Sequence, residues 1–389
     1  MRSDLNRVIE QLRSLDWRFS DYSPSLETTT ISNLHWYPAP FVPHIPSILI
    51  KSLSERGDII LDPFCGTGVT GTEAARLDRR FVQYDINPLA VEIACAKHVA
   101  VQVLSQEFPT SVAREVWRAQ VQEECPKELE ACLEELRRWF HPRTLAQLLT
   151  LRELIADWSN ESARLVLKVI FSSILHRTSS QTNHYSYVVD NCYPSVKLER
   201  DAFTAFLEQL NRAATAVSDF RRSLELNGLI PDLLALGLTK VADARKLTGL
   251  PDNSIDMVVT SPPYVSVNDY VKSQRLTYLF YPPFPLDADE RDIGARRKRH
   301  RRAAVQEYLS DMRGAMDEMV RVTKPDGFIC LALGQSSSTA ATDVVGELVA
   351  YVEESLGSLT LLDVRRPISF RKIQNAGIGF ERIVVLHKE

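Results

Sequence analysis

The sequence lacks the marks of several protein classes. No apolar run in its 389 residues reaches the ~20 residues that a membrane span requires, and the amino terminus has no apolar core of the signal-peptide type. No Cys-x-x-Cys pair occurs, so neither a metal site nor a disulfide framework is predicted. The six cysteines are Cys65, Cys95, Cys125, Cys132, Cys192 and Cys330. We therefore expect a cytoplasmic protein with no bound metal and no membrane partner.

The composition is that of an ordinary soluble globular protein, with 44% hydrophobic and 25% charged residues. The length allows one large domain or two ordinary ones. A net charge of −4 predicts no overall attraction to nucleic acid. Any contact with nucleic acid must therefore come from a local basic patch.

After a short amphipathic helix predicted over 4–15, the chain alternates short apolar runs with helical patterns. Residues 58–62 and 80–85 are predicted strands, and helices are predicted from Thr72 and over 88–97. This alternation is typical of an open parallel α/β sheet with helices on both faces, a Rossmann-like fold. Strand and helix patterns return at 239–244, 255–259, 309–322, 327–333, 359–364 and 382–386. The last two runs are predicted to pair as an antiparallel hairpin.

A long segment between these two parts contains no glycine. None occurs between Gly71 and Gly228, and residues 101–236 show helical spacing. We predict a mainly helical insertion that is large enough to form its own subdomain. The predicted domains are an amino-terminal helix and linker over 1–31, an α/β core over 32–100 and 237–389, and the insertion over 101–236.

Three glycines follow the first predicted strand. Gly66, Gly68 and Gly71 have G-x-G-x-x-G spacing, which lets backbone approach a ligand closely between a strand and a helix. The same spacing also occurs in ordinary strand–helix turns. Asp62 at the end of the strand suits a ligand with a cationic amino group better than a pyrophosphate. The segment from Asp62 to Gly68 is therefore a candidate ligand-binding loop.

Two further aspartates follow later strands. Asp85 comes about 20 residues after the glycines, the spacing at which an acidic residue binds both ribose hydroxyls. It could instead cap the helix that begins near Pro88, as could Asn87. Asp243 ends the third predicted strand, where its carboxylate could accept a hydrogen bond from an adenine amine. The alternative for Asp243 is an ordinary loop or cap aspartate.

Two adjacent prolines follow the apolar run 255–259, in Thr260-Ser261-Pro262-Pro263-Tyr264. Proline fixes φ and removes the backbone donor, so the pair makes a stiff turn with bare carbonyls. A hydroxyl before the turn and an aromatic ring after it offer acceptors for an amino group and a flat surface for a planar ring. The alternative is a turn with a packed tyrosine.

Together these segments resemble the S-adenosylmethionine-dependent amino-methyltransferases of DNA, which modify cytosine N4 or adenine N6. The loop from Asp62 to Gly68 resembles their methionine-binding motif, Asp85 matches the ribose-binding position, and Tyr37-Pro38-Ala39-Pro40-Phe41 resembles the remaining cofactor motif. The resemblance implies a class I methyltransferase sheet. The implied cofactor-binding residues are Tyr37, Pro38, Phe41, Asp62, Pro63, Phe64, Gly66, Thr67, Gly68, Asp85, Ile86, Asp243 and Ala244. The implied catalytic residues are Ser261, Pro262, Pro263 and Tyr264.

The resemblance implies methyl transfer to an exocyclic amine, with S-adenosylhomocysteine as product. The serine form of the catalytic motif is typical of cytosine-N4 enzymes, whereas adenine enzymes more often carry Asp or Asn. We expect Ser261 and the Pro262 carbonyl to hold the amine of a cytosine flipped out of double-stranded DNA, and Tyr264 to stack on it. Adenine-N6 methylation of DNA, guanine-N2 methylation of RNA and a non-enzymatic scaffold are the alternatives. Carbon-5 methylation uses a cysteine nucleophile, usually in a Pro-Cys pair, and no such dipeptide occurs.

A basic run between 296 and 302 contains no acidic residue, which favours a polyanionic substrate. The alternative is a solvated basic face. The candidate nucleic-acid-binding residues are Lys272, Arg275, Arg296, Arg297, Lys298, Arg299, Arg301 and Arg302. The resemblance further implies a restriction–modification or phage-defence setting, with cognate restriction or defence proteins as partners. The insertion is a candidate for target recognition or oligomerisation, and the chain is expected to be a monomer or homodimer.

Overall fold

A computed structural model of the chain describes residues 2–19, 31–38, 41–121, 126–181, 193–226, 228–229, 236–336, 342–367 and 378–389. Ala39, Pro40, Cys125 and Cys192, which were named above, lie outside the described residues. Within the described part, no single helix has the length and apolar character of a membrane span. Helices Pro88–Val103 and Phe108–Arg118 meet that test only as a pair, and they are bent by 107° at the break between them.

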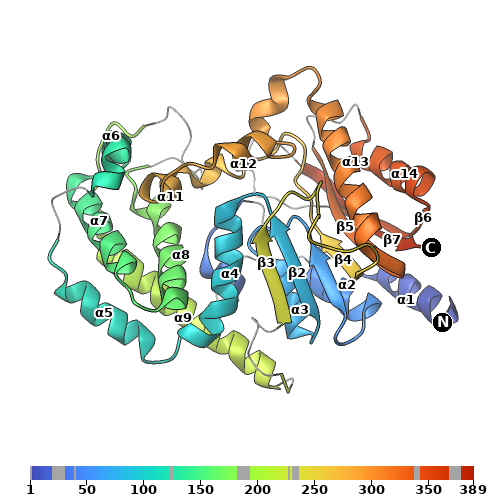
Figure 1. Cartoon of the computed structure of the whole chain (residues 1–389), viewed down its shortest axis with the longest axis horizontal. Helices are drawn as coiled ribbons and strands as arrows, with labels where there is room; N and C mark the ends of the chain where they lie inside the picture. Colours follow the sequence, from blue (N-terminus) through green and yellow to red (C-terminus); the bar gives the residue numbers. More distant parts are fainter. Residues whose placement is uncertain are drawn as a thin grey trace.

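One seven-stranded sheet organises the α/β core (Figure 1). Its strands are β1 (Ile59–Asp62), β2 (Arg80–Asp85), β3 (Gly237–Val241), β4 (Ile255–Thr260), β5 (Thr323–Ser336), β6 (Ser358–Pro367) and β7 (Ile378–Lys388). The strand order is β3-β2-β1-β4-β5-β7-β6, and β7 runs antiparallel to both of its neighbours. This topology confirms the predicted Rossmann-like fold and the predicted hairpin of the last two strands.

Helices cover both faces of the sheet because successive strand residues point to opposite sides. In β1, Ile60 packs into one core and Leu61 into the other; Met257 and Val258 divide in the same way in β4. One face carries α1 (Arg2–Ser14), α2 (His44–Leu53), α3 (Val69–Arg76) and α4 (Pro88–Val103). The other carries α13 (Ala304–Val322) and α14 (Val344–Leu356). The result is a three-layer α/β core.

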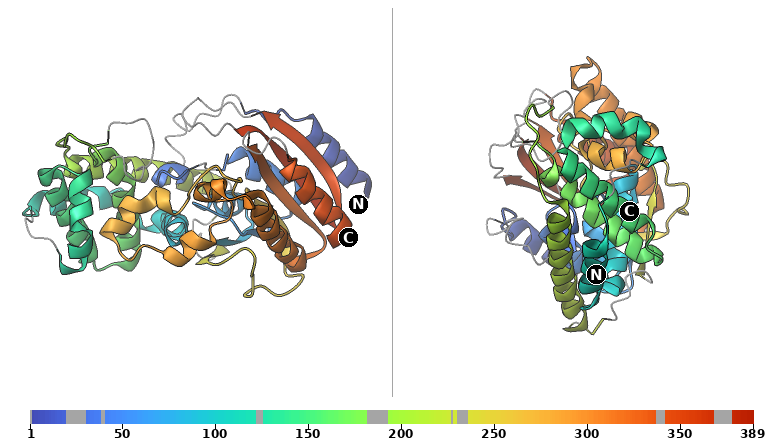
Figure 2. Two further views of the ribbon diagram at one scale, coloured as in Figure 1. Left: turned by 90° about the horizontal axis from the view of Figure 1, so that it is seen from above. Right: turned by 90° about the vertical axis from the view of Figure 1, so that its left-hand side faces the viewer.

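The described residues of the segment 101–236 are mainly helical. Its helices beyond the end of α4 are α5 (Phe108–Arg118), α6 (Glu130–Trp139), α7 (Pro142–Ala156), α8 (Glu161–Thr178) and α9 (Ala202–Leu226), with a 3-10 turn, η2, over Lys127–Leu129. They lie beside the sheet on the side of β3 and lengthen the molecule (Figure 2). Helix α4 lies between the sheet and α8, so it is apolar around most of its circumference. The insertion therefore shares one continuous core with the sheet.

The connection from β4 to α13 carries short elements. These are η3 (Lys272–Gln274), α11 (Arg275–Phe280), α12 (Leu286–Arg291) and η4 (Arg296–His300); a further 3-10 turn, η1, lies at Ile31–Leu34. Figure 1 shows this connection between the insertion and α13. One predicted strand needs correction: β3 ends at Val241, not Ala244. Asp243 instead begins a turn, because its carbonyl accepts the Lys246 amide and its side chain accepts the Arg245 amide.

Candidate active site

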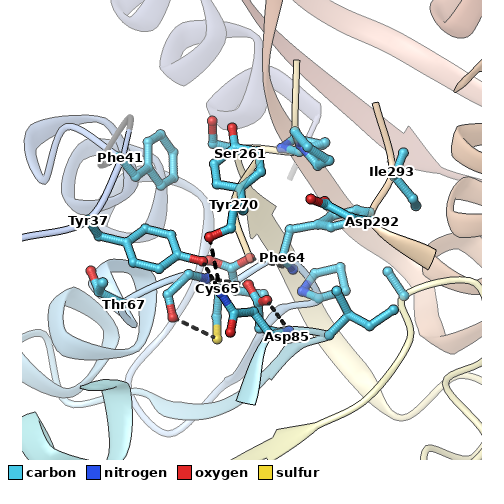
Figure 3. Close-up of a pocket in the computed structure, with 18 of the residues that line it drawn as sticks. Tyr37, Phe41, Phe64, Cys65, Thr67, Asp85, Ser261, Tyr270, Asp292 and Ile293 are labelled. Carbon is cyan, nitrogen blue, oxygen red and sulfur yellow. Dashed lines mark hydrogen bonds between the residues drawn. The ribbon is translucent and has the colours of Figure 1, made fainter. Parts of the chain in front are cut away.

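A cavity lies at the carboxyl ends of β1, β2 and β4, the edge at which open α/β sheets bind ligands. All four predicted catalytic residues line it, together with every predicted cofactor residue except Gly68. The lining residues that had not been predicted are Cys65, Val69, Asn87, Tyr270, Val271, Arg291, Asp292 and Ile293. Figure 3 shows Tyr37 and Asp292 on opposite sides of this cavity.

Asp62 connects the glycine loop to the Pro-Pro turn. Its carboxylate accepts hydrogen bonds from the hydroxyls of Thr70 at 2.5 Å and Thr260 at 2.6 Å, and from the Phe64 amide at 3.1 Å. Burial raises the pKa of Asp62 to about 6, although these hydrogen bonds act to lower it. One buried carboxylate therefore fixes the ends of β1 and β4 relative to each other.

The glycine loop is shaped by positions that exclude a side chain. Gly66 and Gly68 both have positive φ, at 49° and 77°. A Cβ on Gly68 would lie 2.8 Å from the Cβ of Ala94 on α4, whereas one on Gly66 would meet only the Tyr37 ring, at 3.7 Å. Gly68 thus permits helix packing beneath the loop, and Gly66 keeps backbone open to the cavity.

Asp85 joins the same loop to the end of β2. It accepts hydrogen bonds from the amides of Gly66 and Asn87, each at 2.8 Å. Burial raises the pKa of Asp85 to about 6. The helix cap is supplied by Asn87, whose side chain accepts the Leu89 amide at 3.1 Å. The cap role is therefore filled by Asn87, and Asp85 is left facing the cavity.

Asn87 also positions aromatic residues around the cavity. Its amide group donates to the Tyr37 hydroxyl at 3.1 Å and accepts from the Tyr278 hydroxyl at 2.7 Å. The Tyr37 ring stacks on Tyr270 with centroids 6.2 Å apart. These contacts bring the segment before β1 and the segment after β4 to one wall.

Asp243 lines the cavity but is held by two arginines. Its carboxylate accepts from Arg245 at 2.7 and 2.9 Å and from Arg291 at 3.3 Å. Burial acts to raise the pKa of Asp243, but the hydrogen bonds and charges of Arg245 and the charge of Arg291 outweigh it, so the pKa is lowered. Asp243 is therefore a fixed anion at the mouth of the cavity.

The two proline carbonyls of the Pro-Pro turn differ in their hydrogen bonding. The Pro263 carbonyl accepts the Tyr308 hydroxyl at 3.0 Å, and no described residue donates to the Pro262 carbonyl. The Ser261 hydroxyl has only long contacts, 3.4 Å to the Ala332 carbonyl and 3.5 Å to the Tyr264 hydroxyl. Ser261 and Pro262 thus offer acceptors to a ligand in the cavity.

Tyr264 is anchored by a buried ion pair. Its hydroxyl donates to Glu381 at 2.5 Å, and Glu381 pairs with Arg366 at 2.7 Å. The ring packs against Gly334, where a Cβ would lie 2.5 Å from it. Strands β6 and β7, which supply Arg366 and Glu381, therefore set the position of the ring that follows the Pro-Pro turn.

Replacing Arg366 with alanine is expected to lower the free energy of unfolding by about 3–5 kcal/mol, because the Glu381 carboxylate would stay buried without its cation. The Arg366 side chain is only 7% exposed. Urea unfolding of the variant measures the loss. The exposed neighbour Arg365, which lies over the Phe380 ring, is the control, and its alanine variant is expected to lose about 1 kcal/mol or less. Equal losses in the two variants would contradict this role for the buried pair.

The basic run divides into inward and outward residues. Arg297 pairs with Asp289 at 3.1 Å and Asp269 at 3.6 Å, and Lys298 donates to the Asp292 carbonyl at 2.7 Å. The outward, exposed residues are Arg299, Arg301 and Arg302. Among the more distant candidates, Arg275 pairs with Glu135 of α6 at 2.6 Å, while Lys272 and Arg296 also have partners.

The lining residues that had not been predicted carry only weak local signals. Asn87 was visible as a cap, and Cys65 and Val69 stood inside the segment that carries the glycine spacing. Tyr270 follows the Pro-Pro turn by only a few residues, so its aromatic character close to the motif could have marked it. Asp292 lies among charged residues, and no pattern separates it from them.

The residues present fit S-adenosylmethionine. Its methionine part and sulfonium are cationic, and the cavity holds Asp62 and Asp85 as buried carboxylates whose ionised form a cation stabilises. Gly66 offers open backbone, and the apolar side chains of Phe64, Ile86 and Ile293 offer surfaces for an adenine ring.

A family model described as DNA methylase matches residues 4–96 and 255–378. A type II methyltransferase of Methanocaldococcus jannaschii, M.MjaII, is 21% identical over 96% of this chain and 84% of its own length. Another from Geobacillus stearothermophilus, M.BsoBI, is 24% identical over 74% of this chain and 58% of its own length.

Among solved structures, the rRNA methyltransferase aviRa of Streptomyces viridochromogenes aligns with a TM-score of 0.38 and 14% identity, over 96% of each chain. A methyltransferase of Methanosarcina mazei that depends on S-adenosylmethionine aligns with a TM-score of 0.34 and 10% identity, over 91% of this chain and 98% of the other. The fold assignment rests on the strand order itself. The two matched segments lie on either side of the insertion and together cover more than half of the chain. The chain therefore belongs to the S-adenosylmethionine-dependent DNA methylases that modify cytosine N4 or adenine N6.

Proposed function

We propose that this DNA methyltransferase modifies the N4 amine of cytosine. The observation that carries the proposal is the position of Ser261 in the cavity, beside the glycine loop and with no short hydrogen bond of its own. A neutral hydroxyl and a neutral carbonyl suit an amine that must keep its lone pair directed at a methyl group. When bound, S-adenosylmethionine supplies that methyl group on its sulfonium sulfur.

The chain's own residues act mainly by positioning. The Ser261 hydroxyl and the Pro262 carbonyl accept the two amine hydrogens, since the Pro263 carbonyl is already occupied by Tyr308. The Tyr264 ring, held by Glu381 and backed by Gly334, offers its other side to the base. Such stacking contributes about 1–3 kcal/mol. A base paired within a duplex cannot reach this cavity, so the target base must be flipped out.

The contacts of the predicted nucleic-acid-binding residues reduce the number that we assign to DNA phosphates. Arg297, Lys298 and Arg275 are partly buried against acidic or carbonyl partners of this chain, so we assign the phosphate contacts to the exposed arginines Arg299, Arg301 and Arg302. Arg299 donates to the Arg296 carbonyl at 3.2 Å and Arg301 pairs with Glu307 at 3.2 Å, but these contacts join exposed groups and contribute little stability. Arg299, Arg301 and Arg302 lie directly after the segment whose residues 291–293 line the cavity. This closeness in the sequence supports the proposal that these arginines form a cationic surface near the entry of the flipped base.

Replacing Arg299, Arg301 and Arg302 together with alanine is expected to weaken DNA binding at every sequence. The slope of log affinity against log salt is expected to fall by about 0.9 for each phosphate that the variant no longer neutralises. Fluorescence anisotropy with a labelled duplex, measured across a salt series, checks both values. A matched control replaces Arg56 and Arg80, which are exposed at the opposite, amino-terminal edge of β1 and β2. An unchanged salt slope in the triple variant would reject this surface.

Identification of the product tests the proposed target. The protein is incubated with isotopically labelled S-adenosylmethionine and unmethylated plasmid, and the digested nucleosides are separated. Labelled N4-methylcytosine is the expected result. Recovery of N6-methyladenine, or labelling of RNA alone, would overturn the choice of cytosine while leaving the family assignment intact.

The biological setting follows from the relatives. Both curated relatives described above are named type II methyltransferases, and we propose that this chain likewise protects host DNA in a restriction–modification system. In this setting the insertion over 101–236 is a candidate for target recognition, because it continues from α4 beside the edge strand β3.

A further inference from the structure

Asp292 is a buried carboxylate with no assigned role. It lies between α12 and η4, lines the cavity, and is only 4% exposed. Its Oδ2 atom is buried and has no hydrogen-bond partner among the described residues. Figure 3 shows Asp292 beside Ile293, across the cavity from Tyr37. A buried carboxylate without a partner is costly, and a ligand that supplies a positive charge would remove that cost.

Within the described part of the chain, no cation forms an ion pair with the Asp292 side chain. Arg297 is the cation of this chain that most strongly favours the ionised form of Asp292, but it pairs with Asp289 and Asp269. Lys298 donates to the backbone carbonyl of Asp292.

The other charged groups around Asp292 are Asp85, Asp269 and Asp289, and all of them disfavour a second negative charge. The neutral phenols Tyr37 and Tyr270 face it across the cavity.

The burial of Asp292 and the charges around it determine whether its carboxyl group is protonated. Burial raises the pKa of Asp292 to about 8; the charge of Arg297 opposes that shift and the neighbouring carboxylates add to it. At pH 7 the ligand-free cavity therefore holds a proton on Asp292. Asp62 and Asp85, whose pKa values are raised by burial only to about 6, are mostly ionised at that pH.

We propose that Asp292 discriminates between the charged methyl donor and its neutral product, by ionising when the sulfonium cofactor binds. S-adenosylmethionine carries one more positive charge than S-adenosylhomocysteine, and the α-amino and carboxyl groups of the two molecules are the same. The donor thus stabilises the Asp292 carboxylate, whose proton passes to the buffer. After methyl transfer the sulfonium charge is gone and the carboxylate takes a proton back. The proposal rests on the family's cofactor and not on the identity of the target base.

The consequence is a preference for substrate over product. The donor is held by one additional charge interaction, whereas the product meets a neutral carboxyl group. Because Asp292 must lose a proton, donor affinity is expected to rise with pH between about 7 and 8, and product affinity is not expected to follow it. Asp292 is accordingly a specificity-determining residue of the cofactor site.

Isothermal titration calorimetry of the purified protein with S-adenosylmethionine, and separately with S-adenosylhomocysteine, tests the role of Asp292. The titrations use two pH 7 buffers of different ionisation enthalpy, so that the number of protons released is measured directly. The wild-type protein is expected to release close to one proton from Asp292 on binding the donor. In Asp292→Asn this release disappears, donor affinity falls about 10-fold, and product affinity changes by less than about 2-fold. The free α-amino group of the cofactor also titrates near this pH, and comparison with the variant removes its contribution.

The control is Glu290→Gln, which makes the same charge change in α12 on an exposed side chain that does not line the cavity. It is expected to leave proton release and both affinities unchanged. An equal loss of donor and product affinity in Asp292→Asn, or unchanged proton release, would overturn the proposal. If that variant does not fold, the wild-type protein still decides: a ratio of donor to product affinity that stays constant from pH 7 to 8 would reject the role of Asp292.

Discussion

Replacing Ser261 with alanine is expected to lower kcat about 100-fold, with little change in the dissociation constant of S-adenosylmethionine. Among the described residues the Ser261 hydroxyl has contacts only at 3.4 and 3.5 Å, so its acceptor capacity is available to the target amine. The amine becomes positive as it takes the methyl group, and a hydrogen bond to a charged group contributes about 1.5–3 kcal/mol. The interaction therefore acts in the transition state more than in the bound ground state.

Single-turnover kinetics on plasmid DNA, with cofactor binding measured separately, give the two quantities. Ser254 provides the matched control, because it precedes β4 at the opposite end of the strand and donates locally to the Pro251 carbonyl. Ser254→Ala is expected to retain kcat. A Ser261→Ala variant with wild-type kcat would remove Ser261 from the mechanism and with it the main argument for cytosine.

Replacing Gly68 with alanine is expected to cost about 2–5 kcal/mol of stability and most of the cofactor binding. Two costs combine: left-handed backbone costs a non-glycine residue about 1–2 kcal/mol, and overpacking adds about 1–3 kcal/mol. The overpacking arises because the new Cβ would lie 2.8 Å from the Cβ of Ala94. Relief of the clash must move the loop away from α4, which displaces the Gly66 amide from Asp85.

Two further variants separate these costs. Gly57 also has a positive φ, of 88°, but a Cβ there would meet nothing within 4 Å, so Gly57→Ala reports the backbone cost alone. The double variant Gly68→Ala with Ala94→Gly removes the closest contact, leaving approaches of 3.2 Å to Gln83 Oε1 and 3.3 Å to the Cα of residue 94, and is expected to recover part of the cofactor affinity. Thermal unfolding and cofactor titration measure the series. If Gly68→Ala and Gly57→Ala lose equal stability and equal cofactor affinity, the close approach of Gly68 to α4 does not contribute to either quantity.

The sheet was predictable because its signals are local. The buried strand β1 contains a continuous apolar run, Ile59 to Leu61, and the glycine loop and Pro-Pro turn carry their backbone requirements in adjacent residues. The end of β3 was less predictable because β3 is an edge strand with several exposed positions. Its apolar pattern continues past Val241 into the turn at Asp243, and only the hydrogen bonds there mark the boundary.

The site was predictable only where each residue acts within its own motif. The role of Asp62 as a link to Thr260 depends on β1 and β4 being neighbours, which their separation in the chain conceals. The ion pairs of the basic run are hidden for the same reason, since Asp269 and Asp289 reach Arg297 through the folded connection. Charge along the sequence indicates how many cations there are, but their partners come from the fold.

The burial of α4 limits how this enzyme can be divided. A chain trimmed to 32–100 joined to 237–389 would keep α4 but remove α8, and the apolar side of the helix that packs on α8 would then face water. Such a fragment is expected to aggregate. Any exchange of insertions between relatives therefore has to carry the matching surface of α4 along with the transplanted helices.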